Sequence, residues 1–511
     1  MNRPPRLPDA LQAALERLAP ALAAAVLAVA ALLFLRHAFG TTIFPEIATD
    51  ALTDFLPLSL ISWSIDTFGG SAKAYMFAGV VTSLVALGTA VPLLAGRWLA
   101  RLPAWQVAGV LAGTAATLLW LASLVLLLAS AAHLGASERA GYVLGTLAVA
   151  AIYGAAFALL TPRPAAEPAS DIGLLYSRRH LLRLSVDAVA VALAGLYVSR
   201  EVLGRVGGGV QRFLRGKPTP AVTSTSDFYV VSKNLYDPDP DIAGWSLRVD
   251  GLVQRQLTLK LADIEALPYE DNYVTLECIS NQVGGELISN ALWRSVALRD
   301  VLESAALQPA GRFLRFQSDD GYLESLPLSY ALDPKVRLAY RMNDEPLNYK
   351  HGAPLRVLTP GKYGMKGPKW LRKISVIEND INGYWEERGW DQDAWLKTMS
   401  RIDVPAHGDI VQPGLIRVLG IAFAADRGIS RVEVSEDGGA SWHDAELAPA
   451  LSRFAWTHWS YVWDALAGVR ANFVVRATDG TGQLQTQETA DPEPDGASGW
   501  HTAWIRVANE A

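Results

Sequence analysis

Hydrophobic residues lie in long unbroken runs before residue 200 and in short alternating runs after it. The first long run lies too far from a small-residue cleavage site to be a cleaved signal peptide. Because a helix needs roughly 20 apolar residues to cross a bilayer, we predict a membrane region over residues 1–199 with about five transmembrane helices. The expected spans are Ala19–Leu35, Ala74–Ala95, Trp105–Leu128, Tyr142–Leu160 and Leu184–Ser199.

Arginines predict the direction in which these helices cross. Because basic loops stay on the cytoplasmic side, we expect the N-terminus inside and everything after residue 200 outside. The segment 40–73 also falls outside, and its acidic residues favour a solvated loop over a partner surface. The arginines lie ahead of the first run, between the second and third, and between the fourth and fifth, at Arg3, Arg6, Arg17, Arg97, Arg101, Arg163, Arg178, Arg179 and Arg183.

Residues 177–182 read Ser-Arg-Arg-His-Leu-Leu, just ahead of the fifth apolar run. A twin arginine in this position is the address of the Tat system, which exports folded proteins, often with a cofactor in place. Two arginines that only orient a helix would look the same. Because the topology agrees with export, we predict a multi-pass protein of the inner (cell) membrane with its folded part on the periplasmic side.

The chain after residue 200 predicts a linker followed by folded domains. Residues 200–226 are rich in Gly, Pro, Ser and Thr, which is typical of linkers. Short strands and short helices then alternate, which indicates an α+β domain over residues 227–404. The expected elements include strands Ser246–Val249 and Leu257–Leu259 and helices Leu261–Ala266 and Leu298–Ala305.

Strands dominate from Gly408 onwards. The turn Glu436–Gly439 separates two short strands and has the Asp-Gly sequence of a β-hairpin. We therefore predict an immunoglobulin-like β-sandwich over residues 405–511. Its expected strands include Leu415–Ala424, Ser430–Ser435, Ala471–Ala477 and Trp504–Val507.

Charge follows the same division of the chain. Before Arg200 there are 12 basic and 10 acidic residues out of totals of 45 and 51, so the remainder carries 33 and 41 and is acidic. No basic face for nucleic acid is indicated. The single cysteine, Cys278, excludes an intrachain disulfide.

Two segments are candidates for chemistry. Cys278 ends a β-rich run, Tyr-Val-Thr-Leu-Glu-Cys-Ile-Ser-Asn (273–281). A lone cysteine is usually an inert core residue, whereas a thiolate at the open end of a strand could hold a soft transition metal. Residues 351–370 interleave His, Arg and Lys with Gly and Pro. Such a loop suits a phosphate, bound by backbone N–H groups and a guanidinium, although a solvated basic loop has the same composition.

Three motifs together resemble the sulfite oxidase family of molybdenum enzymes. They are Cys-Ile-Ser-Asn (278–281), the His-Gly-x-Pro-x-Arg, Pro-Gly-x-x-Gly and Lys-Trp segment (351–370), and the Asp-Gly-Gly-x-Ser-Trp hairpin (437–442). The resemblance covers about residue 226 to the C-terminus. It implies a molybdenum–molybdopterin cofactor (Mo-MPT), an α+β molybdopterin-binding domain and a C-terminal sandwich similar to the family's dimerisation domain.

The resemblance also implies roles for individual residues. Cys278 would ligate the molybdenum beside the dithiolene sulfurs of a pyranopterin, and Lys233, Asn281 and Trp390 would join it at the catalytic centre. The pterin and its phosphate would be contacted by the remaining motif residues, which are Asn234, His351, Arg356, Tyr363, Gly364, Lys366 and Lys369.

Departures from the family pattern bear on the substrate. Where sulfite-oxidising members have Arg-Asn-His, this chain has Lys233, Asn234 and Leu235, so a bidentate arginine becomes a point-charge lysine. The family's tyrosine in Trp-x-x-Arg-x-Tyr is Trp390 here, and Val283 lies where those members carry arginines. We expect such a pocket to bind a doubly charged sulfite ion poorly. We therefore predict a molybdopterin-dependent oxidoreductase acting on a small S- or N-oxide by two-electron oxygen-atom transfer.

The sequence also indicates which partners the protein would need. The chain has no Cys-x-x-Cys-His haem site, so electrons would pass through a separate cytochrome or quinone-linked membrane protein. The sandwich could form a homodimer. Two alternatives stay open, namely a sulfite oxidase or dehydrogenase that reduces a cytochrome and a non-catalytic membrane-anchored binding protein. The first four spans could also form a transporter or quinone-contacting unit, although no charged residue lies well inside them.

Overall fold

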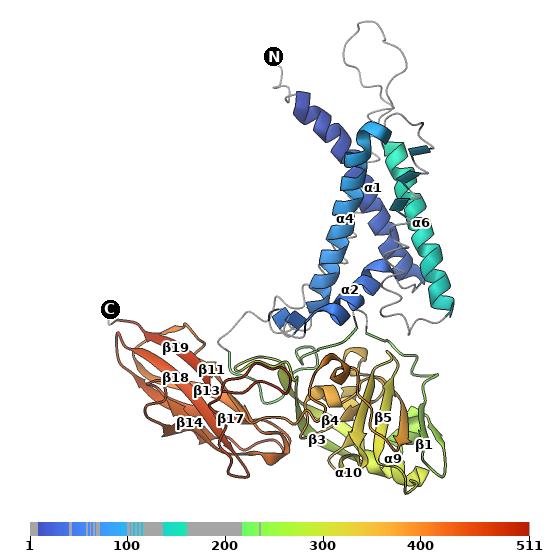
Figure 1. The fold of residues 1–511 in the computed structure, drawn as a ribbon. Coiled ribbons are helices and arrows are strands. Elements are labelled where there is room, and N and C mark those ends of the chain that lie inside the picture. Colours follow the sequence, from blue (N-terminus) through green and yellow to red (C-terminus); the bar gives the residue numbers. More distant parts are fainter. Residues whose placement is uncertain are drawn as a thin grey trace. The chain divides into compact units, whose positions relative to one another are not determined.

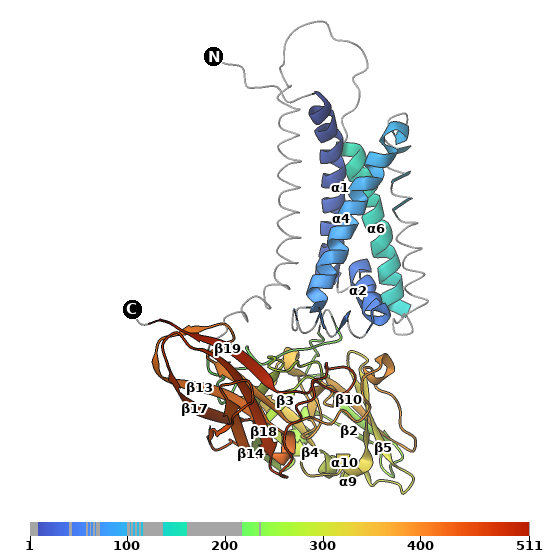
Figure 2. The same cartoon turned by 60° about the vertical axis from the view of Figure 1, so that its left-hand side comes forward.

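The computed structural model of the chain describes residues 9–39, 43–57, 72–99, 136–160 and 217–509 apart from 235 and 236, with scattered positions between 60 and 115. The chain divides into two compact units, one of residues 1–56 with 71–210 and one of residues 57–70 with 211–511. Figures 1 and 2 draw both units, which are described separately below. The twin-arginine segment 177–182, the fifth expected span and most of the third lie outside the described residues.

Long apolar helices build the first unit. Each of α1 (Asp9–Phe39), α4 (Ala72–Leu99) and α6 (Ala136–Leu160) contains a segment long and apolar enough to cross a membrane. α1 packs against both α4 and α6 (Figures 1 and 2). The Tyr153 hydroxyl of α6 donates to the Gly88 carbonyl of α4 at 2.5 Å. The apolar segments Pro20–Ala38, Ala72–Leu94 and Tyr142–Leu160 coincide with the first, second and fourth expected spans.

The segment expected to be a solvated loop contains a helix, α2 (Phe44–Phe55). Pro45 suits its first turn, where a missing N–H costs nothing. Glu46 is buried, with 6% of its surface exposed. Its carboxylate accepts from the Ile43 N–H at 2.9 Å and from Arg36 Nε at 2.6 Å. The loop prediction was wrong because this acidic residue caps a helix and pairs with an arginine of α1.

Two sheets form the domain that carries Cys278. The first has the order β2-β1-β10-β5-β6, with β1 and β10 parallel. The second is antiparallel with the order β3-β4-β7-β8, and β9 also pairs with β7. The strands are β1 (Leu247–Gly251), β2 (Leu257–Leu259), β3 (Tyr269–Glu277), β4 (Ile288–Ala297), β5 (Phe313–Ser318), β6 (Leu323–Pro327), β7 (Arg337–Met342), β8 (Glu345–Pro346), β9 (Arg356–Leu358) and β10 (Leu371–Ile377).

Short helices complete this domain. In α9 (Leu298–Ala305) the buried residues Leu298, Val301, Leu302 and Ala305 recur at the spacing of one helix face and join the apolar cluster around β1 and β10. The four elements predicted between residues 246 and 305 are confirmed. The other helices are α8 (Leu261–Glu265) and α10 (Leu328–Ala331), and single 3₁₀ turns are η4 (Tyr349–His351), η5 (Gly364–Lys366) and η6 (Glu386–Arg388).

The C-terminal domain is a sandwich of two sheets, with the orders β11-β13-β17-β16 and β12-β19-β18-β14-β15. The predicted hairpin is confirmed, since β14 pairs antiparallel with β15 across residues 436–439. Because β11 pairs with β13, the sandwich begins ahead of the predicted boundary at residue 405. The elements are β11 (Met399–Val404), β12 (Ile410–Val411), β13 (Gly414–Phe423), η7 (Ala425–Arg427), β14 (Ile429–Ser435), β15 (His443–Asp444), β16 (Glu446–Leu447), β17 (Thr457–Ala465), β18 (Arg470–Asp479) and β19 (His501–Val507).

The last part of the expected linker, residues 217–226, is held between the two domains. The Ala221 carbonyl accepts from Asn290 Nδ2 of β4 at 2.8 Å and from Trp456 Nε1 of the sandwich at 3.2 Å. Thr219 Oγ1 accepts from Arg401 Nη2 of β11 at 2.8 Å. The Gly, Pro, Ser and Thr composition therefore marks an irregular segment here, and groups of its backbone and side chains are paired by both domains.

Candidate functional site

The cysteine stands where β3 ends and the chain turns back into β4. The Cys278 N–H donates to the Leu287 carbonyl at 2.9 Å, which closes the loop between the two strands. Its side chain lines a cavity and is buried, with 9% of the residue exposed. Burial raises the pKa of the Cys278 thiol to about 11, so a thiolate here needs a cation beside it. A bound metal ion would supply that charge.

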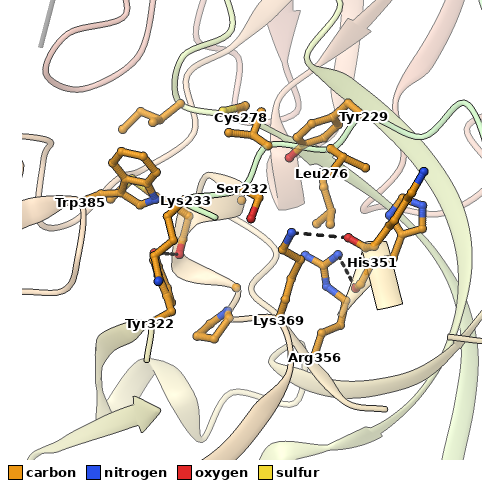
Figure 3. A pocket seen from close by; sticks show the side chains of 18 of the residues that line it. Tyr229, Ser232, Lys233, Leu276, Cys278, Tyr322, His351, Arg356, Lys369 and Trp385 are labelled. Carbon is orange, nitrogen blue, oxygen red and sulfur yellow. Dashed lines mark hydrogen bonds between the residues drawn. The ribbon is translucent and has the colours of Figure 1, made fainter. Parts of the chain in front are cut away.

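The cavity beside Cys278 has an empty volume of about 860 Å³, counted out to its mouth. Its walls come from several elements: the chain before β1, the ends of β3 and β9, the β5–β6 turn, and the loops around η4, η5 and η6. Figure 3 shows side chains from these elements converging on one space, with Cys278 at its edge.

One part of the cavity is strongly basic. Arg356 is buried, and its Nη1 donates to the His351 carbonyl at 3.2 Å while its Nε has no hydrogen-bond partner. Lys369 Nζ lies 3.4 Å from the Lys350 carbonyl (Figure 3). Burial lowers the pKa of Lys369 to about 8 and that of Arg356 to about 10. Among the residues that the structure describes, no carboxylate forms an ion pair with either cation.

Two glycines allow the backbone segments of this basic wall of the cavity to approach each other closely. Gly352 has a φ of 105°, and a Cβ there would lie 2.8 Å from Lys369 Cβ. A Cβ on Gly367 would lie 2.7 Å from the Val357 carbonyl oxygen. A larger residue at either position would displace the backbone that carries Lys369. The motif glycines therefore hold Lys369 close to the strand that carries Arg356.

His351 supports this wall from behind. Its Nε2 lies 2.8 Å from the Thr225 carbonyl, and its ring packs edge-on against Phe228 at 5.4 Å between centroids. Burial lowers the pKa of His351 to about 4, so the imidazole is neutral at physiological pH. Because Nε2 must then donate to Thr225, Nδ1 is the acceptor nitrogen.

The opposite part of the cavity is aromatic and carries balanced charge. Trp385, Trp390 and Tyr322 line it, and Figure 3 shows Trp385 and Tyr322 beside Lys233. Lys233 Nζ donates to the Asp320 carbonyl at 2.8 Å and lies 3.6 Å from the Asp320 carboxylate. The lysine side chain is 15% exposed and the aspartate side chain 4% exposed. The cation nearest the aromatic wall is therefore neutralised by its own partner.

The structure brings together seven of the eleven predicted site residues. Four of the predicted site residues are not among the residues that line the cavity, and Val283 does not line it either. Asn234 Nδ2 donates to the Asp320 carboxylate at 2.9 Å and so steadies the partner of Lys233. Tyr363 is buried in an apolar cluster, and Lys366 is held between two carboxylates. The residues that do line the cavity are Lys233, Cys278, His351, Arg356, Gly364, Lys369 and Trp390.

Asn281, the fourth of these residues, ties the cysteine loop together. Its Oδ1 accepts from the Leu287 N–H at 2.9 Å and its Nδ2 donates to Glu277 Oε1 at 2.8 Å. Both bonds are buried. Its amide therefore joins the end of β3 to the residue just before β4 and does not line the cavity.

We expect Asn281→Ala to lower the free energy of unfolding by about 1–3 kcal/mol, because the buried Leu287 N–H and the Glu277 carboxyl would lose their partners. Denaturant unfolding of the purified protein measures this change. The matched control is Asn382→Ala, which truncates an exposed amide and should leave stability within about 0.5 kcal/mol of the wild type. Equal stability of the two variants would contradict the structural role of Asn281.

Sequence reasoning missed several residues of the cavity. Tyr229, Asp320, Tyr322 and Trp385 all line it. Asp320 and Tyr322 lie on and after the tight β5–β6 turn, whose Asp-Asp-Gly sequence indicates a turn. Nothing in the sequence shows that this turn faces Cys278, since the two come from different sheets. Trp385 is the first residue of the Trp-x-x-Arg-x-Trp segment noted in the sequence, but no role was predicted for it.

The basic wall and the thiol fit a large anionic cofactor that carries a metal. Two cations without carboxylate partners and an unpaired buried guanidinium nitrogen match a phosphate better than they match solvent. No group of three or more His, Cys, Asp or Glu side chains gathers to hold a metal among the described residues. A cofactor that brings its own sulfur ligands would therefore need only Cys278 from this site.

Two family models match the part of the chain that forms this site. The model described as "Oxidoreductase molybdopterin binding domain" matches residues 235–385. The model described as "Mo-co oxidoreductase dimerisation domain" matches residues 392–508, which is the sandwich with a few residues before it.

Known proteins are similar over the same region. Sulfite oxidase of Arabidopsis thaliana is 32% identical over 276 residues, which cover 44% of this chain and 70% of that protein. Mitochondrial sulfite oxidase of Mus musculus is 30% identical over 352 residues, covering 58% of this chain and 64% of that protein. Nitrate reductase (NADPH) of Fusarium oxysporum is 29% identical over 262 residues, covering 41% and 29%.

Among solved structures, the sulfane dehydrogenase SoxCD of Paracoccus pantotrophus matches with a TM-score of 0.50 and 21% sequence identity. The match covers 58% of this chain and 87% of that chain. At this identity the likeness concerns the fold alone.

Proposed function

Because this chain belongs to the sulfite oxidase family of molybdopterin-dependent oxidoreductases, we propose that it performs two-electron oxygen-atom transfer on a small S- or N-oxide beside Cys278. The family membership, the α+β molybdopterin domain and the dimerisation-type sandwich confirm those predictions from the sequence. A molybdenum–molybdopterin cofactor follows from the same membership. This cofactor supplies the two-electron oxygen chemistry when it is bound.

The protein's own residues divide between two tasks in this proposal. Cys278 would give the metal its protein ligand. Arg356 and Lys369 would bind the pterin phosphate, since neither cation has a carboxylate partner among the described residues and Arg356 is buried with an unpaired Nε. His351, being neutral and donating from Nε2 to Thr225, can accept a hydrogen bond at Nδ1 without adding charge. The loop glycines keep the backbone close enough for N–H groups to reach the cofactor.

One observation supports the substrate class, namely the paired charge at the aromatic end of the cavity. Lys233 is neutralised by Asp320, and Trp385 and Trp390 give the wall an apolar surface. A dianion such as sulfite would lose its hydration there without gaining a bidentate partner. A small oxide with one polar oxygen needs only a hydrogen-bond donor, which Lys233 provides.

A substrate panel tests the proposal. The purified, molybdenum-loaded chain would be given reduced methyl viologen with dimethyl sulfoxide or trimethylamine N-oxide, and separately sulfite with ferricyanide. We expect higher kcat/KM for an oxide than for sulfite. Efficient sulfite oxidation with no turnover of either oxide would overturn the proposed substrate class and favour the alternative of a sulfite oxidase or dehydrogenase.

We expect Asp320→Asn to lower the KM for sulfite about tenfold, or about 1.4 kcal/mol, because the charge of Lys233 is then no longer balanced by the Asp320 carboxylate. The change leaves an amide that can still accept from the Tyr322 N–H, now 2.9 Å from Asp320 Oδ1. Steady-state kinetics with sulfite and with dimethyl sulfoxide measure the effect. A matched control is Asp319→Asn, on an exposed neighbour that does not line the cavity. Equal sulfite KM values in both variants would contradict a charge-balanced substrate end.

We further propose that α1, α4 and α6 anchor the enzyme in the inner (cell) membrane, with the catalytic unit on the periplasmic side after Tat export. Three helices of sufficient length and apolarity support anchoring. Electrons would come from a separate cytochrome or quinone-linked membrane protein, and the sandwich would support a homodimer. Protease treatment of intact spheroplasts tests the orientation, since an outward catalytic unit would be digested without lysis.

A further inference from the structure

A buried lysine held between two buried glutamates lies behind the aromatic wall of the cavity. Lys366 Nζ is 2.5 Å from Glu324 Oε1 and 2.7 Å from Glu386 Oε1. The three side chains are 3%, 0% and 2% exposed respectively. Two carboxylates therefore share one cation in a site closed to solvent, which leaves one negative charge without a positive partner.

Each member of this Glu324–Lys366–Glu386 cluster lies within two residues of one that lines the cavity. Lys366 follows Met365, and Glu386 follows Trp385. Tyr322, two residues before Glu324, also lines the cavity, and its hydroxyl lies 3.2 Å from Glu324 Oε2 and donates to the Met365 carbonyl at 2.7 Å. The cluster is thus one side chain away from the substrate end of the cavity.

The arrangement accommodates a proton in addition to the one on lysine. Glu386 Oε2 is buried and has no hydrogen-bond partner. A buried polar atom without a partner is costly, so the cluster has room for one more hydrogen-bond donor. Burial raises the pKa of Glu324, the charge of Lys366 opposes this, and the charge of Glu386 raises it further. Two carboxylates this close to one cation favour a state in which they hold one proton between them.

We propose that Glu324 and Glu386 share a titratable proton and that this proton serves the reaction in the cavity through Tyr322. The inference rests on the proposed function. Reduction of a sulfoxide by a two-electron donor is R₂SO + 2 H⁺ + 2 e⁻ → R₂S + H₂O, so the departing oxygen leaves as water and two protons are consumed. The cluster supplies one of them from behind the wall and is recharged from solvent after product leaves.

Several other charged or titratable groups surround the cluster and define its field. Burial raises the pKa of Tyr322 most, and the charges of Glu324, Glu386 and Asp320 raise it further. Burial lowers the pKa of Lys362, which is repelled by Lys366 and attracted by Glu324. Asp380 accepts from the Ser325 hydroxyl beside Glu324 at 2.5 Å. Lys233 and Arg388 both lie over the ring of Tyr384, which is 6.0 Å from Tyr322 between centroids. None of these groups places a second cation within ion-pair distance of Glu386 among the described residues.

The test removes one carboxylate and keeps the ion pair. In Glu386→Gln the remaining Lys366–Glu324 pair is balanced one to one, so Glu324 should ionise and the stored proton should be lost. The matched control is Glu387→Gln, the same change on the exposed next residue. Both variants would be studied as full-length, molybdenum-loaded protein, and Glu324→Gln is the second variant should Glu386→Gln fail to fold.

The first readout is infrared spectroscopy of the carboxyl C=O stretch, which needs no substrate. We expect a protonated-carboxyl band in the difference between wild type and Glu386→Gln, and none in the difference between wild type and Glu387→Gln. The second readout is kcat for dimethyl sulfoxide with reduced methyl viologen across mildly acidic to alkaline pH. We expect kcat to fall about 100-fold in Glu386→Gln, the lower end of the range for removal of a general acid. The decline of kcat with rising pH should also disappear.

The absence of the band in wild type, or identical kcat–pH profiles for wild type and Glu386→Gln, would overturn the inference. If neither oxide is turned over, the proposed substrate class fails by itself. The same variants are then compared with sulfite and ferricyanide, because that reaction releases two protons and needs an acceptor in the same place. A wild-type profile in Glu386→Gln with sulfite would likewise overturn the inference.

Discussion

Replacing Cys278 by serine should reduce the rate of oxygen-atom transfer by at least about 10³-fold, because even residues that only support a metal's ligands cost 10–100-fold when removed. Serine keeps the size of the side chain but replaces a soft thiolate donor with a hydroxyl that stays protonated. The apo protein should fold normally, since the substitution adds no bulk at the end of β3. Turnover per molybdenum, measured after counting metal and pterin separately, gives the effect.

Thiol labelling gives this experiment an internal control. Cys278 is the only cysteine in the chain, so a small alkylating reagent reports on one site. We expect the apo protein to be labelled and the cofactor-loaded protein to be protected. Full activity in Cys278→Ser, or equal labelling with and without cofactor, would show that the thiol is an inert core residue.

Replacing Arg356 by methionine should reduce molybdopterin affinity by about 10²-fold or more, because losing one partner of a desolvated charge pair costs about 2–5 kcal/mol. The same change should leave the apo protein as stable as the wild type or more stable. Arg356 is buried without a carboxylate partner among the described residues, and its Nε lacks a hydrogen bond. Removing an uncompensated buried cation therefore relieves a desolvation penalty.

These opposite effects distinguish a binding residue from a structural one. Cofactor content after dialysis reports on affinity, and thermal unfolding of the apo protein reports on stability. Arg312→Met is the matched control, since it makes the same change at an exposed position and should alter neither quantity. A marked loss of apo stability in Arg356→Met would mean that the guanidinium holds the fold together and has no special relation to phosphate.

Much of the fold could be predicted because local patterns were decisive. The apolar runs later found in α1, α4 and α6 stood out by length, and α9 stood out by the spacing of its buried residues. The hairpin at residues 436–439 was visible because Asp437 and the following glycines suit a tight turn. In the structure Asp437 accepts from the Ser441 hydroxyl and from the N–H groups of Ser441 and Ala440, which holds its pKa well below its usual range.

The site was predicted less completely because its parts come from distant segments. Motif residues could be named one at a time, but burial and pairing decide what each one does. Lys366 and Lys369 look alike in sequence, yet one is held by two carboxylates and the other has no carboxylate partner among the described residues. Asn281 lies in the cysteine motif but points into the loop. Such differences depend on contacts across sheets, and no local pattern records them.

The segment 217–226 has a consequence for how the catalytic unit comes apart. Besides its bonds to Asn290, Arg401 and Trp456, its Thr225 carbonyl lies 2.8 Å from His351 Nε2. Melting of either domain would release the segment and leave buried donors in the other without partners, at about 1–3 kcal/mol each. The α+β domain and the sandwich should therefore lose their structure in a single cooperative transition, with the ten residues 217–226 coupling the two.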